Sequence, residues 1–122
     1  MITDTFLSEL AKDLNGEVAL VPSWLAFGSD VIVPNAGSTD LAGDYSERFA
    51  LTGSRASNSV TFSGIRLAVD VVGSSGDVLN AAALFSASSG PTLLAETTLS
   101  SILQTSAYDV EIDWKITFSR AS

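Results

Sequence analysis

Histidine and cysteine, which carry much of the catalytic and metal chemistry of proteins, are both absent from the 122 residues. Their absence excludes disulfides, thiolate nucleophiles, the common zinc sites and every catalytic dyad or triad that uses imidazole. A serine nucleophile would need a lysine as its base, and the only lysines, Lys12 and Lys115, lie in no recognisable catalytic motif. We therefore expect no catalytic residue, no cofactor and no enzymatic activity.

Carboxylates are the remaining candidates for chemistry, and they gather in two places. One group follows a single strand face, at Asp109, Glu111 and Asp113. Neighbours in this row are about 7 Å apart, too far to share one ion without help from another strand, so we interpret it as a solvated face that discourages edge pairing. The second group lacks the spacing of a calcium loop and consists of Asp40, Asp44 and Glu47. We predict no metal site, and nothing favours a hydrolase built on carboxylates alone.

The charge balance narrows the range of partners. Six basic residues against fourteen acidic ones give a formal charge of -8, so nucleic acid and anionic membrane surfaces should repel the chain. No apolar run approaches the roughly 20 residues of a membrane span, and no secretory signal is visible at the N-terminus. We expect no nucleic-acid partner and no membrane partner.

The two tryptophans are candidates for stacking on a sugar ring. Trp114 is in phase with five other apolar residues of its strand, so we assign it to the core. Trp24 follows Pro22 and is the aromatic residue that we expect at a surface contact. A glycan-binding β-sandwich module that uses Trp24 and loop carboxylates, with a host-surface glycan as its partner, is the alternative to a structural role.

Residues 1–16 are predicted to form the only helix. Their apolar stripe consists of Ile2, Phe6, Leu7, Leu10, Ala11 and Leu14. Thr3 suits the N-cap, Asn15-Gly16 suits the C-terminus, and Glu9 and Asp13 are expected on the wet face with Lys12. The stripe either packs on the sheet of its own subunit or docks on a neighbour. The candidate assembly contacts are therefore Phe6, Leu7, Leu10, Leu14 and Trp24.

After Gly16 the apolar period changes to two, which predicts a single mainly β domain over residues 17–122, an antiparallel β-sandwich or jelly roll. The clearest strand covers residues 108–119. Within residues 58–72, Val60 and Phe62 set an even-numbered apolar face, but the apolar residues from Ile65 onward are odd-numbered. The apolar phase thus slips by one at Gly64, which predicts a β-bulge or a crossing between sheets. Shorter strands are expected over 24–28, 30–33, 48–52, 79–86 and 92–96, and the longest loop over 34–46.

An ordered set of short motifs covers residues 24–119. It begins with Leu25-Ala26-Phe27-Gly28, Thr39-Asp40-Leu41 and Asn58-Ser59-Val60-Thr61-Phe62, and continues with Ala83-Leu84-Phe85-Ser86, Leu93-Leu94-Ala95 and Asp113-Trp114-Lys115-Ile116. In this order the sequence resembles the small β-rich structural proteins of tailed viruses. The resemblance implies a non-enzymatic virion protein, a homo-oligomeric tail or fibre component or a capsid decoration protein. Its expected partners are copies of itself and other virion proteins, and it would be assembled in the host cytoplasm and located in the virion.

Overall fold

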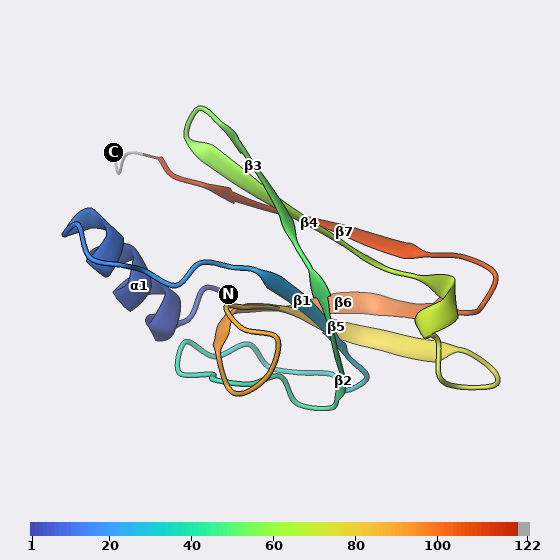
Figure 1. The fold of residues 1–122 in the computed structure, drawn as a ribbon. Coiled ribbons are helices and arrows are strands. Elements are labelled where there is room, and N and C mark those ends of the chain that lie inside the picture. Colours follow the sequence, from blue (N-terminus) through green and yellow to red (C-terminus); the bar gives the residue numbers. More distant parts are fainter. Residues whose placement is uncertain (120–122) are drawn as a thin grey trace.

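The computed structural model describes residues 1–119, apart from the side chain of Ser46 (Figure 1). One α-helix precedes the strands, as predicted, and a short 3-10 helix, η1, lies between the fourth and fifth strands. The elements are α1 (Asp4–Leu14), β1 (Trp24–Gly28), β2 (Asp44–Ala50), β3 (Thr52–Ala56), β4 (Ser59–Arg66), η1 (Ala68–Asp70), β5 (Asp77–Phe85), β6 (Leu93–Gln104) and β7 (Val110–Thr117).

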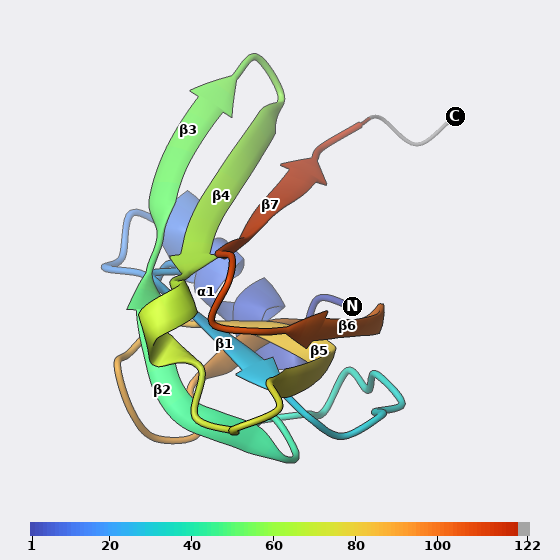
Figure 2. The same ribbon diagram turned by 90° about the vertical axis from the view of Figure 1, so that its right-hand side faces the viewer.

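The strands form two antiparallel sheets in a sandwich-like arrangement, which confirms the predicted fold class. The four-stranded sheet has the order β2-β1-β5-β6, and the three-stranded sheet has the order β3-β4-β7. Figures 1 and 2 show the two sheets close together near η1 and diverging toward α1. The chain crosses between them after β2, after β4 and after β6.

The four-stranded sheet is buried on both faces. Its inner face contributes Leu25, Phe27 and Leu84 to the core that it shares with α1 and the three-stranded sheet. Its outer face carries a second apolar cluster, which includes Ala83 and Phe85 and is covered by Leu41 from the loop between β1 and β2. Burial on both sides explains why β1 and β5 are nearly continuous apolar runs instead of alternating ones.

The helix has the predicted caps but a different buried face. The Thr3 side chain accepts a hydrogen bond from the Phe6 amide, and the helix is capped at Asn15 at its other end. The prediction that Glu9 lies on the wet face is wrong, because Glu9 is buried beside Phe6. The helix turns Phe6 and Glu9 toward the body of the protein and leaves Leu14 in solvent.

The strand predicted over 108–119 forms as the shorter β7, Val110–Thr117, with the alternation that the sequence indicates. Tyr108 and Phe118, at the two ends of the predicted strand, lie outside β7 and are exposed. The predicted β-bulge at Gly64 is wrong, since β4 pairs with β7 without a shift in register from Ser59 to Arg66. A Cβ on Gly64 would lie 2.7 Å from Leu25 Cδ2, so this glycine lets the two sheets approach closely. The inner face of β4 then continues at Arg66, not at Ile65, which is exposed.

The shorter strands are predicted in part. Residues 24–28 form β1 as predicted, while the segments expected over 79–86 and 92–96 lie in the longer β5 and β6. The segment over 48–52 falls on the end of β2 and the start of β3, a strand that the apolar pattern missed. No strand forms over 30–33, because this segment belongs to the loop that covers the outer face of the sheet and inserts Ile32 there.

Candidate assembly surface

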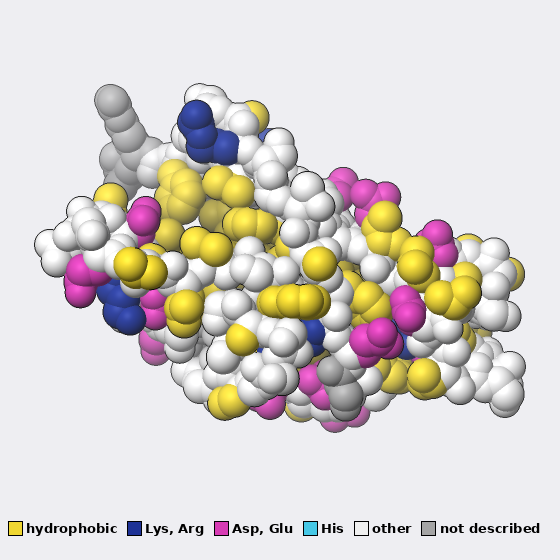
Figure 3. Space-filling model, viewed as in Figure 1, with side chains coloured by type: hydrophobic (Ala, Val, Ile, Leu, Met, Phe, Trp, Pro, Cys, Tyr) yellow, Lys and Arg dark blue, Asp and Glu magenta, His cyan; other side chains and the backbone are white. Residues whose placement is uncertain are grey.

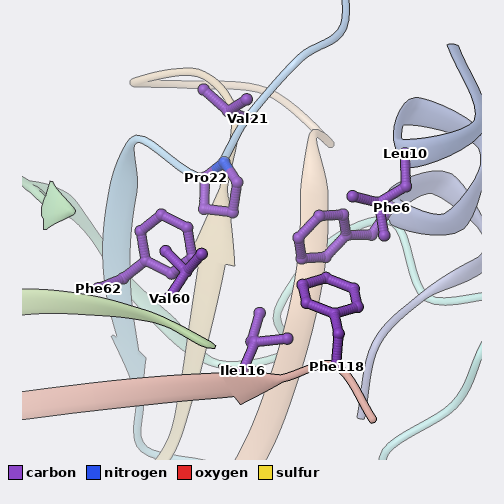
Figure 4. A pocket seen from close by; sticks show the side chains of 8 residues that line it. All are labelled: Phe6, Leu10, Val21, Pro22, Val60, Phe62, Ile116 and Phe118. Atoms are coloured by element: carbon purple, nitrogen blue, oxygen red, sulfur yellow. The ribbon is translucent and has the colours of Figure 1, made fainter. Parts of the chain in front are cut away.

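An apolar cavity of about 280 Å³ opens between α1 and the diverging ends of the sheets. We call it the apolar wedge, and it is lined by Phe6, Leu10, Val21, Pro22, Val60, Phe62, Ile116 and Phe118. Figure 4 shows Phe6 and Phe62 extending into the wedge from α1 and β4 on its two sides. The lining holds no charged or hydrogen-bonding side chain, so the wedge can bury apolar surface but offers no group for acid–base or nucleophilic chemistry.

The first wall of the wedge is α1, which is anchored to β6 through Thr3. The Thr3 hydroxyl donates to the carbonyl of Leu94 at 2.9 Å, and the Thr3 amide donates to the same carbonyl at 2.9 Å. The hydroxyl oxygen also accepts from the Phe6 amide at 3.4 Å. One buried side chain therefore caps the helix and fixes it to the four-stranded sheet, which places Phe6 and Leu10 in the wedge.

Glu9 holds the segment that returns from α1 to β1. Its carboxylate accepts from the Leu20 amide at 2.8 Å and from Lys12 Nζ at 3.0 Å. The hydrogen bond from Leu20, followed by that from Lys12, lowers the pKa of Glu9 below its ordinary value of 4.5. The ionised carboxylate thus fixes the return segment, from which Val21 and Pro22 line the wedge.

Exposed apolar side chains surround the wedge. Leu14, one helical turn after Leu10, is 90% exposed, and Leu7 of the same helix is 56% exposed. Phe118 is 52% exposed after the end of β7. Val18 and Leu20 of the return segment are also exposed. Figure 3 shows apolar side chains gathered in a hollow between α1 and the β3–β4 hairpin. An apolar surface of this kind is typical of an interaction site.

The structure separates the five predicted assembly contacts. Phe6 is buried and Leu10 is half-buried, and both pack on the core of their own subunit, while Leu7 and Leu14 stay in solvent. Trp24 belongs to a different part of the structure, because it lies half-buried against the second apolar cluster on the outer face of the four-stranded sheet. The helix therefore packs on its own sheet, which was one of the two alternatives, and docking of its exposed apolar residues on a neighbour stays a prediction.

The acidic row on β7 is exposed and partly engaged in hydrogen bonds. Asp113 accepts from the Ser63 hydroxyl at 2.7 Å, and Asp109 accepts from the Ala68 amide at 2.8 Å. Glu111 is exposed between them. Within residues 1–119, no three acidic side chains come together in a way that would hold a metal ion.

A buried polar cluster, which sequence reasoning missed, joins the two sheets at the end opposite the wedge. Arg66 at the end of β4 donates to Asp77 Oδ2 at 2.6 Å and to Gln104 Oε1 at 2.8 Å. The Gln104 amide donates back to the carbonyl of Arg66 at 2.8 Å. The ring of Tyr45 lies 4.9 Å from the Arg66 guanidinium carbon. We call Arg66, Asp77 and Gln104 the polar clip; all three are buried, so they present no surface to a substrate.

The acid of the polar clip is held in its charged form. Burial by itself would raise the pKa of Asp77, but hydrogen bonds from the Val72 amide, from Arg66 and from the Gly73 amide outweigh it and lower the pKa below the ordinary 3.8. Asp77 and Arg66 are therefore an ion pair at neutral pH, and this pair belongs to the fold rather than to a reaction.

Comparison with known proteins adds no relative. No family model and no curated protein matches the sequence, and no solved structure matches the fold. Among the described residues, no helix has the length and apolar character needed to cross a membrane.

Proposed function

We propose that this chain is a non-enzymatic structural subunit of a tailed-virus particle, a tail or fibre component or a capsid decoration protein that assembles with copies of itself. The observation that carries the proposal is the apolar wedge with its exposed rim. A surface of this kind supplies binding energy by burying apolar area, which is what an assembly subunit requires. The order of motifs over residues 24–119 supplies the viral part of the proposal.

The composition of the wedge favours a protein partner over a small molecule. Small-molecule sites combine apolar walls with a few convergent polar groups that orient the ligand. The eight side chains of the wedge offer no such group. An apolar segment of a neighbouring subunit fits these walls better than a substrate or a cofactor does.

Glycan binding through Trp24 has less support. A sugar ring stacks on an aromatic face that solvent can reach, whereas Trp24 packs against the apolar cluster beneath the loop between β1 and β2. Arg48, whose guanidinium lies over the Phe85 ring of the same cluster, donates to the carbonyls of Ala87 and Gly90, so it is already engaged. Binding to a glycan array that is lost in Trp24→Ala would favour the glycan module over the structural subunit.

The experiment that tests the proposal combines light scattering on the pure chain with its recovery in particles. We expect an oligomer at micromolar concentration and co-purification with a particle. Leu14→Asp should weaken incorporation, because it places a charge on the rim of the wedge. Val33→Asp is the matched control, since Val33 is also 90% exposed but lies in the loop between β1 and β2. A monomer that never joins a particle would refute the proposal.

A further inference from the structure

Strand β7 is an open edge of the three-stranded sheet. It pairs with β4 on one side, and among the described residues no strand pairs with its other side. Figure 2 shows β7 as the outer strand beside β4. An edge of eight regular residues presents unpaired N–H and C=O groups in a row, which is a template for a further strand.

The side chains of β7 are sorted by face. The inner face carries Val110, Ile112, Trp114 and Ile116, and the outer face carries Glu111, Asp113, Lys115 and Thr117. Ile112 and Trp114 are only half-buried, because no strand that the structure describes continues the sheet beyond β7. Lys115 forms no ion pair with any residue that the structure describes. The strand therefore has an incomplete apolar face and a basic side chain available to an acidic partner.

We propose that the occupant of this edge is β7 of a second copy of the same chain, paired antiparallel across a two-fold axis that passes between the two Trp114 residues. This interface rests on the proposed function, since it supplies one contact of the homo-oligomer. In this register Asp113 faces Lys115 of the second copy, and Lys115 faces its Asp113. Ile112 faces Ile116 of the copy in the same way, so that charge meets opposite charge and apolar meets apolar.

The charges on the outer face favour the register centred on Trp114 over its neighbours. A two-fold axis perpendicular to the sheet keeps each side chain on its own face, so the axis can move along the strand only in whole residues. An axis at Asp113 opposes two aspartates, although it also pairs Glu111 with Lys115, and an axis at Ile112 opposes Glu111 to Asp113. An axis at Lys115 opposes two lysines, and an axis at Ile116 sets Lys115 opposite Thr117 and forms no charge pair. Like charges directly opposite each other are destabilising. Among these five registers, the one centred on Trp114 is therefore the one that forms opposite-charge pairs and opposes no like charges.

The other edges of the two sheets are less suited to self-pairing. The outer edge of β6 is occupied near Ala95 by a bridge to Ile2, and further along the strand Ser101 adopts a positive φ of 57°. Strand β3 has only exposed residues and contains Gly53. In β2 the guanidinium of Arg48 is committed to two carbonyls. Strand β7 alone combines an apolar face with self-complementary charges.

Pairing through β7 would join two three-stranded sheets into one continuous sheet. Val110 of the second copy would lie opposite Phe118, which is 52% exposed in the single chain. Because Phe118 also lines the apolar wedge, the new interface would be continuous with that surface. The dimer would thereby cover apolar side chains that the subunit leaves in contact with solvent.

Cysteine pairs test the register directly, because the chain has no cysteine of its own. With the axis at Trp114, residue 111 lies opposite residue 117 of the copy, at a Cα separation of about 4.5 to 5.5 Å that suits a disulfide. Within one strand the two positions are about 20 Å apart, too far to be bridged. Glu111→Cys/Thr117→Cys should therefore form a covalent dimer on mild oxidation, while either single variant should not. An equal mixture of the two single variants should cross-link again.

A charge series gives an independent readout that does not depend on cysteine. Lys115→Glu should weaken self-association at least about tenfold, since it turns two attractive pairs into repulsive ones. The exchange Asp113→Lys/Lys115→Asp should restore association to within about threefold. Arg55→Glu is the matched control, because it makes the same charge change on β3, at the opposite edge of the sheet. Circular dichroism verifies that each variant is folded.

The outcomes separate this interface from the proposed function. A covalent dimer from the double cysteine variant, together with rescue by the charge exchange, supports pairing through β7. Association of the native chain with neither cross-linking nor a charge effect overturns the β7 interface and leaves the structural subunit in place. A native chain that stays monomeric at all concentrations overturns the β7 interface, and failure to join any particle overturns the proposed function as well.

Discussion

Replacing Gly64 by alanine should destabilise the protein, because Gly64 lies where the two sheets touch. A Cβ at this position would be 2.7 Å from Leu25 Cδ2, 3.2 Å from Leu25 Cβ and 3.2 Å from Leu51 Cδ2. Leu25 has no exposed surface, so its side chain has no free space into which it can move. The new methyl group must therefore push the sheets apart or force a neighbouring side chain out of its preferred conformation.

The size of the effect follows from two opposing contributions. Overpacking of a filled core costs about 1 to 3 kcal/mol. Alanine also restricts the unfolded chain relative to glycine, which stabilises by about 0.4 to 1 kcal/mol wherever the backbone accepts it. The backbone of Gly64 is not in the left-handed region, so this benefit applies. We expect a net loss of about 1 to 2 kcal/mol, which lowers the urea midpoint by roughly 0.5 to 1 M.

Gly53→Ala is the matched control, since Gly53 is also a strand glycine of the same sheet. Its Cβ would meet only Phe62 Cε1 at 3.6 Å, an ordinary contact, so we expect unchanged or slightly higher stability. Urea unfolding followed by tryptophan fluorescence, with all variants at one protein concentration, measures both changes. If Gly64→Ala unfolds at the same midpoint as Gly53→Ala, the sheets do not meet at Gly64 and the packing argument is wrong.

Further predictions concern the polar clip and the anchor of α1. Asp77→Asn should lower the free energy of unfolding by about 3 to 5 kcal/mol, because it leaves Arg66 buried without its counter-charge; a change below about 1 kcal/mol would contradict the ion pair. Because the pKa of Asp77 is lowered from 3.8 on folding, its stabilising contribution is complete above about pH 4 and declines as the pH falls further; urea midpoints between pH 7 and pH 2 should show this decline in the native chain and less of it in Asp77→Asn. Thr3→Val should cost about 1 kcal/mol in a thermal unfolding experiment, while Thr3→Ser should retain most of the stability.

Local signals account for the parts of the fold that the sequence predicted. The caps of α1 depend on residues within a few positions of each helix end, and Thr3 and Asn15 act as expected. The alternation along β7 was equally local and gave the buried face of that strand correctly. The sandwich-like arrangement follows from the change to a period of two after the helix, together with the turn residues that separate the strands.

Two of the errors, at Gly64 and at Glu9, have one physical origin, which is the pairing of buried polar groups over long distances in the sequence. Arg66 falls on the inner face of β4, where a pattern of apolar residues predicts none, and its partners Asp77 and Gln104 are 11 and 38 residues away. The apolar pattern puts Ile65 on the inner face that Arg66 occupies, and this is why it predicts a β-bulge at Gly64. Glu9 is a parallel case, because its buried carboxylate is satisfied by the Leu20 amide, 11 residues along the chain.

The two ends of the sandwich show why the candidate assembly surface lies where it does. At the η1 end, the polar clip ties the last residue of β4 to the first of β5 and the last of β6, which fixes the spacing of the sheets. At the other end no such clip forms among residues 1–119, and the sheets diverge around α1 (Figure 1). The helix fills only part of this opening, since Phe6 is buried while Phe118 across the wedge stays half exposed. The apolar surface left over at the open end, close to the edge strand β7, is therefore what the proposed subunit would offer to a neighbour.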